Sequence, residues 1–230
     1  MDKKMCILGT RTTSEEWADM ATEIGYDVIY FVENWDRSMV GTQINGVPVI
    51  WYEDLVNIKE DFHLACCIST TQRSRYIEQI NQLLPHTSWP VLIHPSSEKS
   101  ISPSVKIGNG TLIGRNVSIG AYATIGKNCI VKDGAILGHN SIFGDCLTLA
   151  PGANIAGACE IGSYCWIGIG AVVIDHINVG ENVLVAAGAL VVKDIPSNTT
   201  VMGIPAKAFI PKKESAVLSR IHGDKLIIQE

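Results

Sequence analysis

VKIGNG at 105–110, TLIGRN at 111–116 and VSIGAY at 117–122 open a six-residue repeat that continues without an insertion to residue 194. An aliphatic residue or Phe holds the third place of every unit, and Gly follows it in nine of the fifteen units. A period of six matches neither the 3.6-residue period of an α-helix nor the two-residue alternation of an ordinary strand. The repeat therefore predicts a β-helix of short strands and tight turns, with the third-place side chains inside.

Three units make one triangular coil of eighteen residues, so residues eighteen apart are expected to stack on adjacent coils. The sixth place is Gly, Asn or Asp in ten of the fifteen units, and these residues tolerate the left-handed backbone of a sharp corner. A convex prism has no pocket of its own, so we expect a second copy to supply the missing wall, in a C3 trimer. Two columns stand out: Gly134, Gly152, Gly170 and Gly188, and an adjoining one of Ala121, His139, Gly157, Asp175 and Lys193.

The first ninety residues lack the six-residue repeat, and short apolar runs alternate there with helical patterns. We expect strands at 4–9, 26–32, 48–51, 63–69 and 91–93, and helices at 13–24 and 71–84, with a capping box of Thr13 and Glu16. Such alternation favours a small parallel α/β, Rossmann-like layer. The predicted domains are an α/β domain at 1–95, the β-helix at 96–210, and a tail at 211–230 with a short helix near 216–221.

Composition narrows the classes of function. The net charge of −5 argues against a nucleic-acid partner, and the charge divides into −7 for residues 1–98 and +2 for residues 99–230. The repeat half is thus the better host for an anionic ligand. The seven cysteines show no metal-binding spacing, and no signal peptide or apolar run of eighteen residues is present. We expect a cytoplasmic protein with reduced thiols, no membrane span and no metal.

The repeats, the ending MGIPAK at 202–207, the pair Gly138-His139 and the segment NGVPV at 45–49 resemble the left-handed β-helix hexapeptide acyltransferases. The small α/β domain in front makes the chain similar to one sugar acetyltransferase group of that family. This group contains sialic acid O-acetyltransferases and N-acetyltransferases of nucleotide-linked 4-amino sugars. The resemblance implies a homotrimer that uses acetyl-CoA to acylate an amino sugar in surface-glycan synthesis.

The resemblance also implies roles for single residues. His139 matches the general base, and Gly157 matches the residue whose N–H stabilises the oxyanion. Asn140 stands where many relatives have Asp or Glu, and is either a turn residue or a partner of the base. Acetyl-CoA is expected to pass Gly157, and its further contacts are expected at Gly170, Gly188, Lys193 and Lys207.

The sugar or its nucleotide is expected on the front domain. The candidate contacts are Gly9 and Arg11 in the first loop, and Thr70, Arg73 and Arg75 at the start of the second helix. Three other functions stay open at this point. A sugar O-acetyltransferase has the same machinery, a metal-dependent hydro-lyase like the γ-type carbonic anhydrases needs three histidines at a subunit interface, and a scaffold needs no chemistry.

Overall fold

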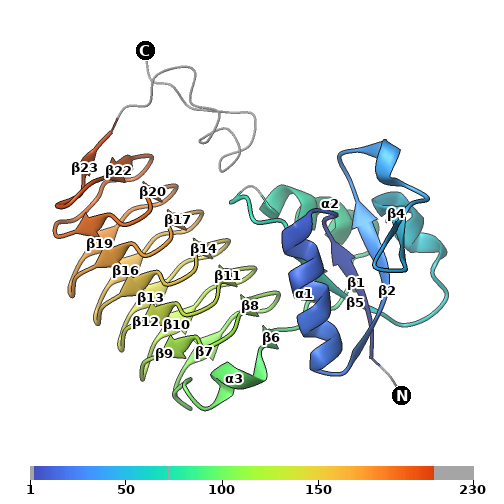
Figure 1. Cartoon of the computed structure of the whole chain (residues 1–230), viewed down its shortest axis with the longest axis horizontal. Helices are drawn as coiled ribbons and strands as arrows, with labels where there is room; N and C mark the ends of the chain where they lie inside the picture. The colour runs from blue at the N-terminus through green and yellow to red at the C-terminus, as the bar shows by residue number, and fades with distance from the viewer. Residues whose placement is uncertain (1–2, 72, 210–230) are drawn as a thin grey trace. The chain divides into compact units, whose positions relative to one another are not determined.

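The structure is a computed structural model that describes residues 3–71 and 73–209 (Figure 1). The chain divides into two compact units: Met1–Ser69 with Arg73–Leu92, and Thr70–Gln72 with Ile93–Glu230. The first unit contains β1 (Lys3–Leu8), α1 (Thr12–Glu23), β2 (Tyr26–Glu33), the 3₁₀ turn η1 (Arg37–Met39), β3 (Gln43–Ile44), β4 (Val47–Trp51), η2 (Tyr52–Asn57), β5 (His63–Cys66) and α2 (Arg73–Leu83).

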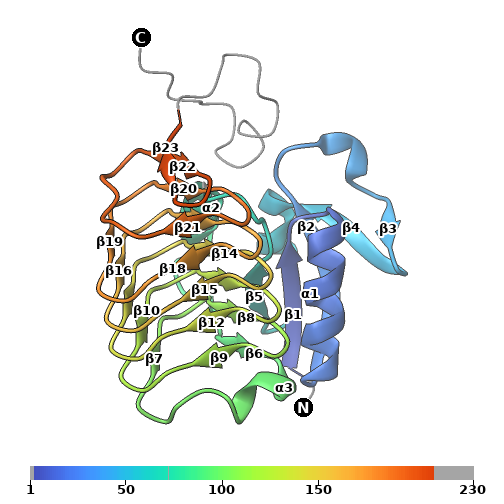
Figure 2. The same ribbon diagram turned by 60° about the vertical axis from the view of Figure 1, so that its left-hand side comes forward.

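The first unit is built on a five-stranded sheet of order β3-β4-β2-β1-β5. β4, β2, β1 and β5 run parallel, and β3 is an antiparallel edge strand. Figure 2 shows α1 lying along β1 and β2. Leu8, Val32, Leu64 and Ile77 are among the buried residues of the core. Because the chain leaves β1 for β2 on one side and returns to β5 on the other, the loops after β1 and β5 meet at one edge of the sheet, where α/β folds bind ligands.

The expected α/β layer is confirmed, with local differences. α1 begins at Thr12 after the N-cap residue Arg11, whose side chain makes no capping hydrogen bond, so the helix does not begin with Thr13 as its cap. β5 ends at Cys66 rather than residue 69, and α2 begins at Arg73. The edge strand β3 and the two 3₁₀ turns are too short to leave a periodic signal in the sequence.

The second unit is the expected β-helix, built from two-residue strands. β6 (Leu92–Ile93) and α3 (Pro95–Glu98) lead into the repeats, and β22 (Thr200–Met202) and β23 (Lys207–Ala208) follow them. The fifteen repeat strands are β7 (106–107), β8 (112–113), β9 (118–119), β10 (124–125), β11 (130–131), β12 (136–137), β13 (142–143), β14 (148–149), β15 (154–155), β16 (160–161), β17 (166–167), β18 (172–173), β19 (178–179), β20 (184–185) and β21 (190–191).

The eighteen-residue register holds throughout the prism. Each repeat strand pairs in parallel with the strand one coil further on, so that paired residues are eighteen apart, such as Thr124 and Ile142. The third-place side chains from Ile113 to Val191 are all buried in one continuous core. Every sixth-place residue from Gly110 to Gly188 has a positive φ, including Tyr122, Cys146 and His176. The corner is therefore imposed by the coil even where the residue is not Gly or Asn.

We name the three faces by one strand each. The β12 face contains β9, β12, β15, β18 and β21, the β13 face contains β7, β10, β13, β16 and β19, and the β14 face carries the remaining strands (Figure 1). On the β14 face the outward side chains of Leu112, Ile130 and Thr148 are buried. On the β12 face Ile136 and Val172 are 45% and 37% exposed.

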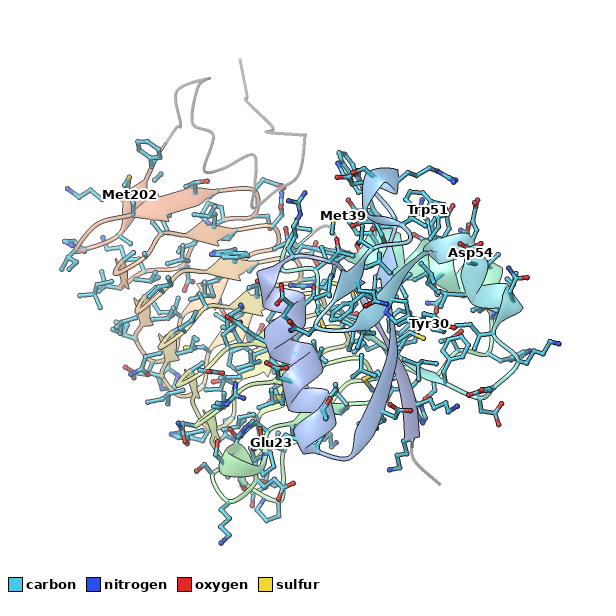
Figure 3. The ribbon with its side chains drawn as sticks, turned by 45° about the vertical axis from the view of Figure 1, so that its right-hand side comes forward. Glu23, Tyr30, Met39, Trp51, Asp54 and Met202 are labelled. Atoms are coloured by element: carbon cyan, nitrogen blue, oxygen red, sulfur yellow. The ribbon has the colours of Figure 1, made fainter. Side chains whose placement is uncertain are left out.

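The last coil ends with β22, which carries Met202 (Figure 3). The helix predicted near residues 216–221 lies outside the described residues. Among residues 3–71 and 73–209, no helix is long and apolar enough to cross a bilayer.

Candidate active site

His139 lies in the turn between β12 and β13, on an edge that we call the His139 edge: Ala121, His139, Gly157, Asp175 and Lys193. The side chain is exposed rather than turned into the core. Its backbone is held by both neighbouring coils, because its carbonyl accepts from Ala158 N at 2.8 Å and Asn140 N donates to Ala121 O at 2.9 Å. The imidazole therefore stands on a fixed backbone and faces outward.

Asn140 orients the imidazole. Its Oδ1 lies 3.0 Å from His139 Nδ1. An amide oxygen only accepts, so this contact favours a proton on Nδ1 and leaves the lone pair of Nε2 available. Asn140 also has φ of 56°, so it forms the corner as well. The turn role is therefore observed, and the contact with His139 is compatible with the second predicted role.

Gly157 sits one coil beyond His139, directly against the ring. A Cβ on Gly157 would lie 2.7 Å from both Cε1 and Nε2 of His139, so the imidazole fills the space that a side chain would take. The N–H of Gly157 donates to no group among residues 3–71 and 73–209. A base with an available lone pair and an uncommitted N–H thus lie side by side.

Buried polar side chains stiffen this edge from within. Ser141 is fully buried, and its hydroxyl lies 3.2 Å from Ala156 O and 3.4 Å from His139 O. It also accepts from Cys159 N at 3.0 Å. Ser141 was not singled out in the sequence, although a hydroxyl at a first place, where small apolar residues dominate, was a visible signal.

The predicted acetyl-CoA contacts fall on two different edges. Gly170 and Gly188 turn the chain from the β14 face to the β12 face, whereas His139 and Gly157 turn it from the β12 face to the β13 face. A strand lies between the two columns, so they do not form the single adjoining strip that the sequence suggested. Within one chain, Gly170 and Gly188 border the β12 face at the edge opposite His139.

Lys193 and Lys207 are exposed. Lys193 is on the His139 edge, three coils from His139, a rise of about 14 Å at about 4.8 Å per strand. The β13 face carries a groove of about 650 Å³ lined by the carboxylates of Glu160, Glu181 and Asp194. The β12 face has no charged outward residue, so an anionic ligand at His139 is favoured on that side.

In the first unit, the loops after β1, β2 and β5 meet at the carboxyl edge of the sheet. A Cβ on Gly9 would lie 3.3 Å from Ile68 Cγ1, which places the first and last of these loops in contact. Arg11 is exposed, and its charge adds to the hydrogen bonds from Ser38 that lower the pKa of Asp36. Arg11 and the β2 loop therefore lie near each other at this edge.

Glu33, which sequence reasoning missed, organises the same edge. This buried carboxylate ends β2, accepts from the Thr10 hydroxyl, and accepts from the backbone N–H groups of Asn34 at 2.8 Å and Trp35 at 2.7 Å. An acidic residue closing an apolar strand was the available signal. The position is that of the acid that holds a ribose in dinucleotide-binding folds, but here the carboxylate binds its own loops.

The candidate residues at the start of α2 differ in burial. Arg73 is fully buried, and its guanidinium donates to Ile68 O at 2.9 Å and Ser69 O at 3.3 Å. It holds the loop after β5, which differs from the predicted contact with a substrate phosphate. Arg75 is exposed, and Thr70 is half-buried and falls in the second compact unit. Helical spacing could not show which of the two arginines faces inward.

The chain is similar to several known proteins. Residues 95–203 match the family model described as GMPPB C-terminal domain. The chain resembles a histidine variant of perosamine N-acetyltransferase from Caulobacter crescentus, solved with CoA and GDP-perosamine: TM-score 0.83, 26% identity, 91% of this chain and 98% of that one. It also resembles the acetyltransferase domain of PglB from Neisseria gonorrhoeae with acetyl coenzyme A: TM-score 0.80, 29% identity, 91% and 100% coverage.

The chain resembles the hexapeptide-repeat acyltransferases in structure over nine tenths of its length. The expected resemblance is thus confirmed, as is the left-handed β-helix with an α/β region in front. Curated relatives match shorter stretches, among them galactoside O-acetyltransferase of Lactococcus lactis, 34% identical over 28% of this chain and 31% of that protein. A tetrahydropyridine-dicarboxylate N-acetyltransferase of Enterococcus faecalis is 54% identical over 18% of each chain. The chain spans about a third or less of the length of these curated relatives.

Proposed function

We propose that this protein transfers the acetyl group of acetyl-CoA to the amino group of a nucleotide-linked amino sugar. The observation that carries the proposal is the pairing of His139 with the uncommitted N–H of Gly157 on an exposed edge. The similarity to a GDP-perosamine N-acetyltransferase over 91% of the chain supports an amine acceptor rather than the hydroxyl of the alternative prediction.

In the proposed reaction, Nε2 of His139 takes a proton from the attacking nitrogen as the new C–N bond forms at the thioester carbon. The N–H of Gly157 donates to the carbonyl oxygen as it becomes negative. When the C–S bond breaks, the protonated His139 returns the proton to the leaving thiolate. Asn140 accepts from Nδ1–H, so the ring keeps Nε2 directed toward the attacking nitrogen and the leaving thiolate. General base catalysis of this kind contributes about 10²–10⁴-fold.

We assign the acyl transfer to residues 96–210 and the sugar nucleotide to residues 1–95. Gly9, Arg11 and Arg75 of the first unit remain proposed contacts, as does Thr70, and Arg73 is better explained as support for the loop after β5. Along the prism, Lys193 and Lys207 are the proposed partners of CoA phosphates. All seven cysteines are free and buried, which supports our proposal of the cytoplasm as the working compartment.

The predicted homotrimer is part of the proposal. The outward residues of the β12 face are uncharged, and Val172, Ile174 and Ile136 are exposed on it. A second copy packed there would bury these residues and bring its own Gly170 edge toward the β12 face beside His139. Val172→Asp is expected to reduce the mass in sedimentation from three chains of 24.9 kDa to one. Thr124→Asp on the β13 face is the matched control, and an unchanged mass for Val172→Asp would remove this face from the interface.

The function is tested with purified protein, acetyl-CoA and GDP-linked 4-amino sugar, following the released CoA thiol. His139→Ala is expected to lower kcat at least 10²-fold with little change in CoA affinity by calorimetry. His86→Ala, in a surface turn of the first unit, is the control. A fully active His139→Ala protein, or a wild-type protein that does not bind acetyl-CoA, would contradict the proposal. A thermal-shift screen of other nucleotide sugars then identifies the nucleotide.

A further inference from the structure

Several fifth-place N–H groups of the prism are capped by a side chain from the next coil. In each case the acceptor is an Asp or Ser at the following corner of the same edge. A capped N–H has no remaining proton to offer a ligand. The four pairs are Arg115 N with Asp133 Oδ1 (2.8 Å), Lys127 N with Asp145 Oδ1 (2.7 Å), Asp145 N with Ser163 Oγ (3.0 Å) and Glu181 N with Ser197 Oγ (2.9 Å).

The residue before each capped N–H is glycine, for a steric reason. A Cβ on Gly144 would lie 2.6 Å from Ser163 Oγ, and a Cβ on Gly180 would lie 2.5 Å from Ser197 Oγ. The same clash, with the Oδ1 of Asp133 or Asp145, arises at the other two glycines. Such separations are far inside the van der Waals contact distance of about 3.5 Å. Backbone atoms of the next coil are equally close, as Ser163 N is at 2.6 Å from the same Cβ on Gly144. At the four capped sites, a methyl and the capping oxygen would nevertheless compete for the same space.

Gly157 breaks this pattern although an acceptor is present. Asp175 stands one coil beyond Gly157, and the strands on which they follow are in register, Ile155 with Val173. The residue before Gly157 is Ala156 rather than glycine, so a methyl is present where the four capped sites have none. The Asp175 carboxylate instead lies 3.8 Å from His176 Nε2, and the N–H of Gly157 bonds to nothing in the described part of the chain.

We propose that Ala156 is a positioning residue that holds Asp175 off the N–H of Gly157 and so keeps the oxyanion donor open. The inference rests on the proposed function. A carboxylate bound to this N–H would occupy the donor and set a negative charge against the developing oxyanion, and one such donor contributes about 10²–10³-fold to kcat. His176 assists by offering Asp175 an alternative partner.

The test is a double-mutant cycle. Ala156→Gly is expected to let Asp175 cap Gly157, with kcat falling about 10²-fold or more and CoA affinity within threefold of wild type. Asp175→Ala alone is expected to stay within threefold of wild type. Adding Asp175→Ala to Ala156→Gly is expected to restore kcat to within threefold of Asp175→Ala. Ala186→Gly, the same change at a fourth place on the β14 face, measures the effect of added backbone freedom alone.

A crystal structure of Ala156→Gly provides a readout that does not depend on activity. An Asp175 oxygen within hydrogen-bonding distance of Gly157 N is expected. Full activity of Ala156→Gly, a loss that Asp175→Ala does not rescue, or an Asp175 carboxylate that stays away from Gly157 N would each overturn the inference. If no variant, wild type included, transfers acetyl groups, the proposed function fails, and the Asp175–Gly157 contact still decides whether Ala156 excludes the cap.

Discussion

Replacing Gly157 by alanine displaces the imidazole that we propose as the base. The new Cβ would lie 2.7 Å from Cε1 and Nε2 of His139, whereas carbon atoms in contact settle at about 3.5 Å or more. The ring must therefore retreat by roughly 0.8 Å or rotate away. A misplacement of about 1 Å at a reacting group lowers rates about 10²-fold. Gly157 is not among the glycines with positive φ, so alanine fits its backbone and keeps the N–H.

The assay separates chemistry from binding and folding. For Gly157→Ala we expect kcat to fall about 10²-fold, with the melting temperature unchanged within a few degrees. Gly152→Ala is the control, because its Cβ would meet nothing within 4 Å while its φ of 66° makes alanine strained by about 1–2 kcal/mol. That variant should lose stability and keep kcat. A Gly157→Ala enzyme that retains more than a third of the wild-type kcat would refute the link between this contact and the placement of His139.

Three further predictions follow from single side chains. Asn140→Gly keeps the left-handed corner but removes Oδ1, so we expect kcat to fall about tenfold with little change in melting temperature; an unchanged kcat would leave Asn140 with the corner alone. Glu33→Gln places an amide NH₂ or a single oxygen where a carboxylate accepts from the Thr10 hydroxyl and from two N–H groups of the loop after β2, so we expect a loss of about 2–4 kcal/mol in urea unfolding and a raised KM for the sugar nucleotide, with acetyl-CoA affinity as the unaffected control. Burial raises the pKa of Cys165 from 9.0 to about 12, so its contribution to stability is complete below about pH 9 and is lost as pH rises toward 12. The melting temperature of the wild type should therefore fall more steeply above pH 9 than that of Cys165→Ala, and parallel curves would contradict this.

The repeat made the prism predictable because its geometry is periodic. A six-residue beat sets which side chains are inside, where the corners turn and which residues stack, so His139 and Gly157 could be placed together before any coordinates. The same periodicity imposes positive φ even on Tyr122 and Ala158, which composition alone would not suggest.

The repeat does not determine which hydrogen-bond partner a side chain takes. Asp175 has the register and chemistry of a cap, yet its carboxylate lies 3.8 Å from His176 Nε2, and we propose that Ala156 keeps it from the N–H of Gly157. Arg73 and Arg75 look alike on a helical pattern, yet one is buried under the β5 loop and the other is exposed. The glycine column does not adjoin His139, because a strand of the β12 face separates the two edges.

Because every coil has eighteen residues, the distance between two residues on the His139 edge is set by the number of coils between them. The paired strands show no slip, so the separation between His139 and Lys193 changes only in whole steps of about 4.8 Å. Gain or loss of one coil between them would move Lys193 along the prism axis by one strand spacing and keep it on the same edge. In prisms of this kind, a change in the number of coils therefore adjusts the distance between two groups on one edge to the length of the ligand that binds along it.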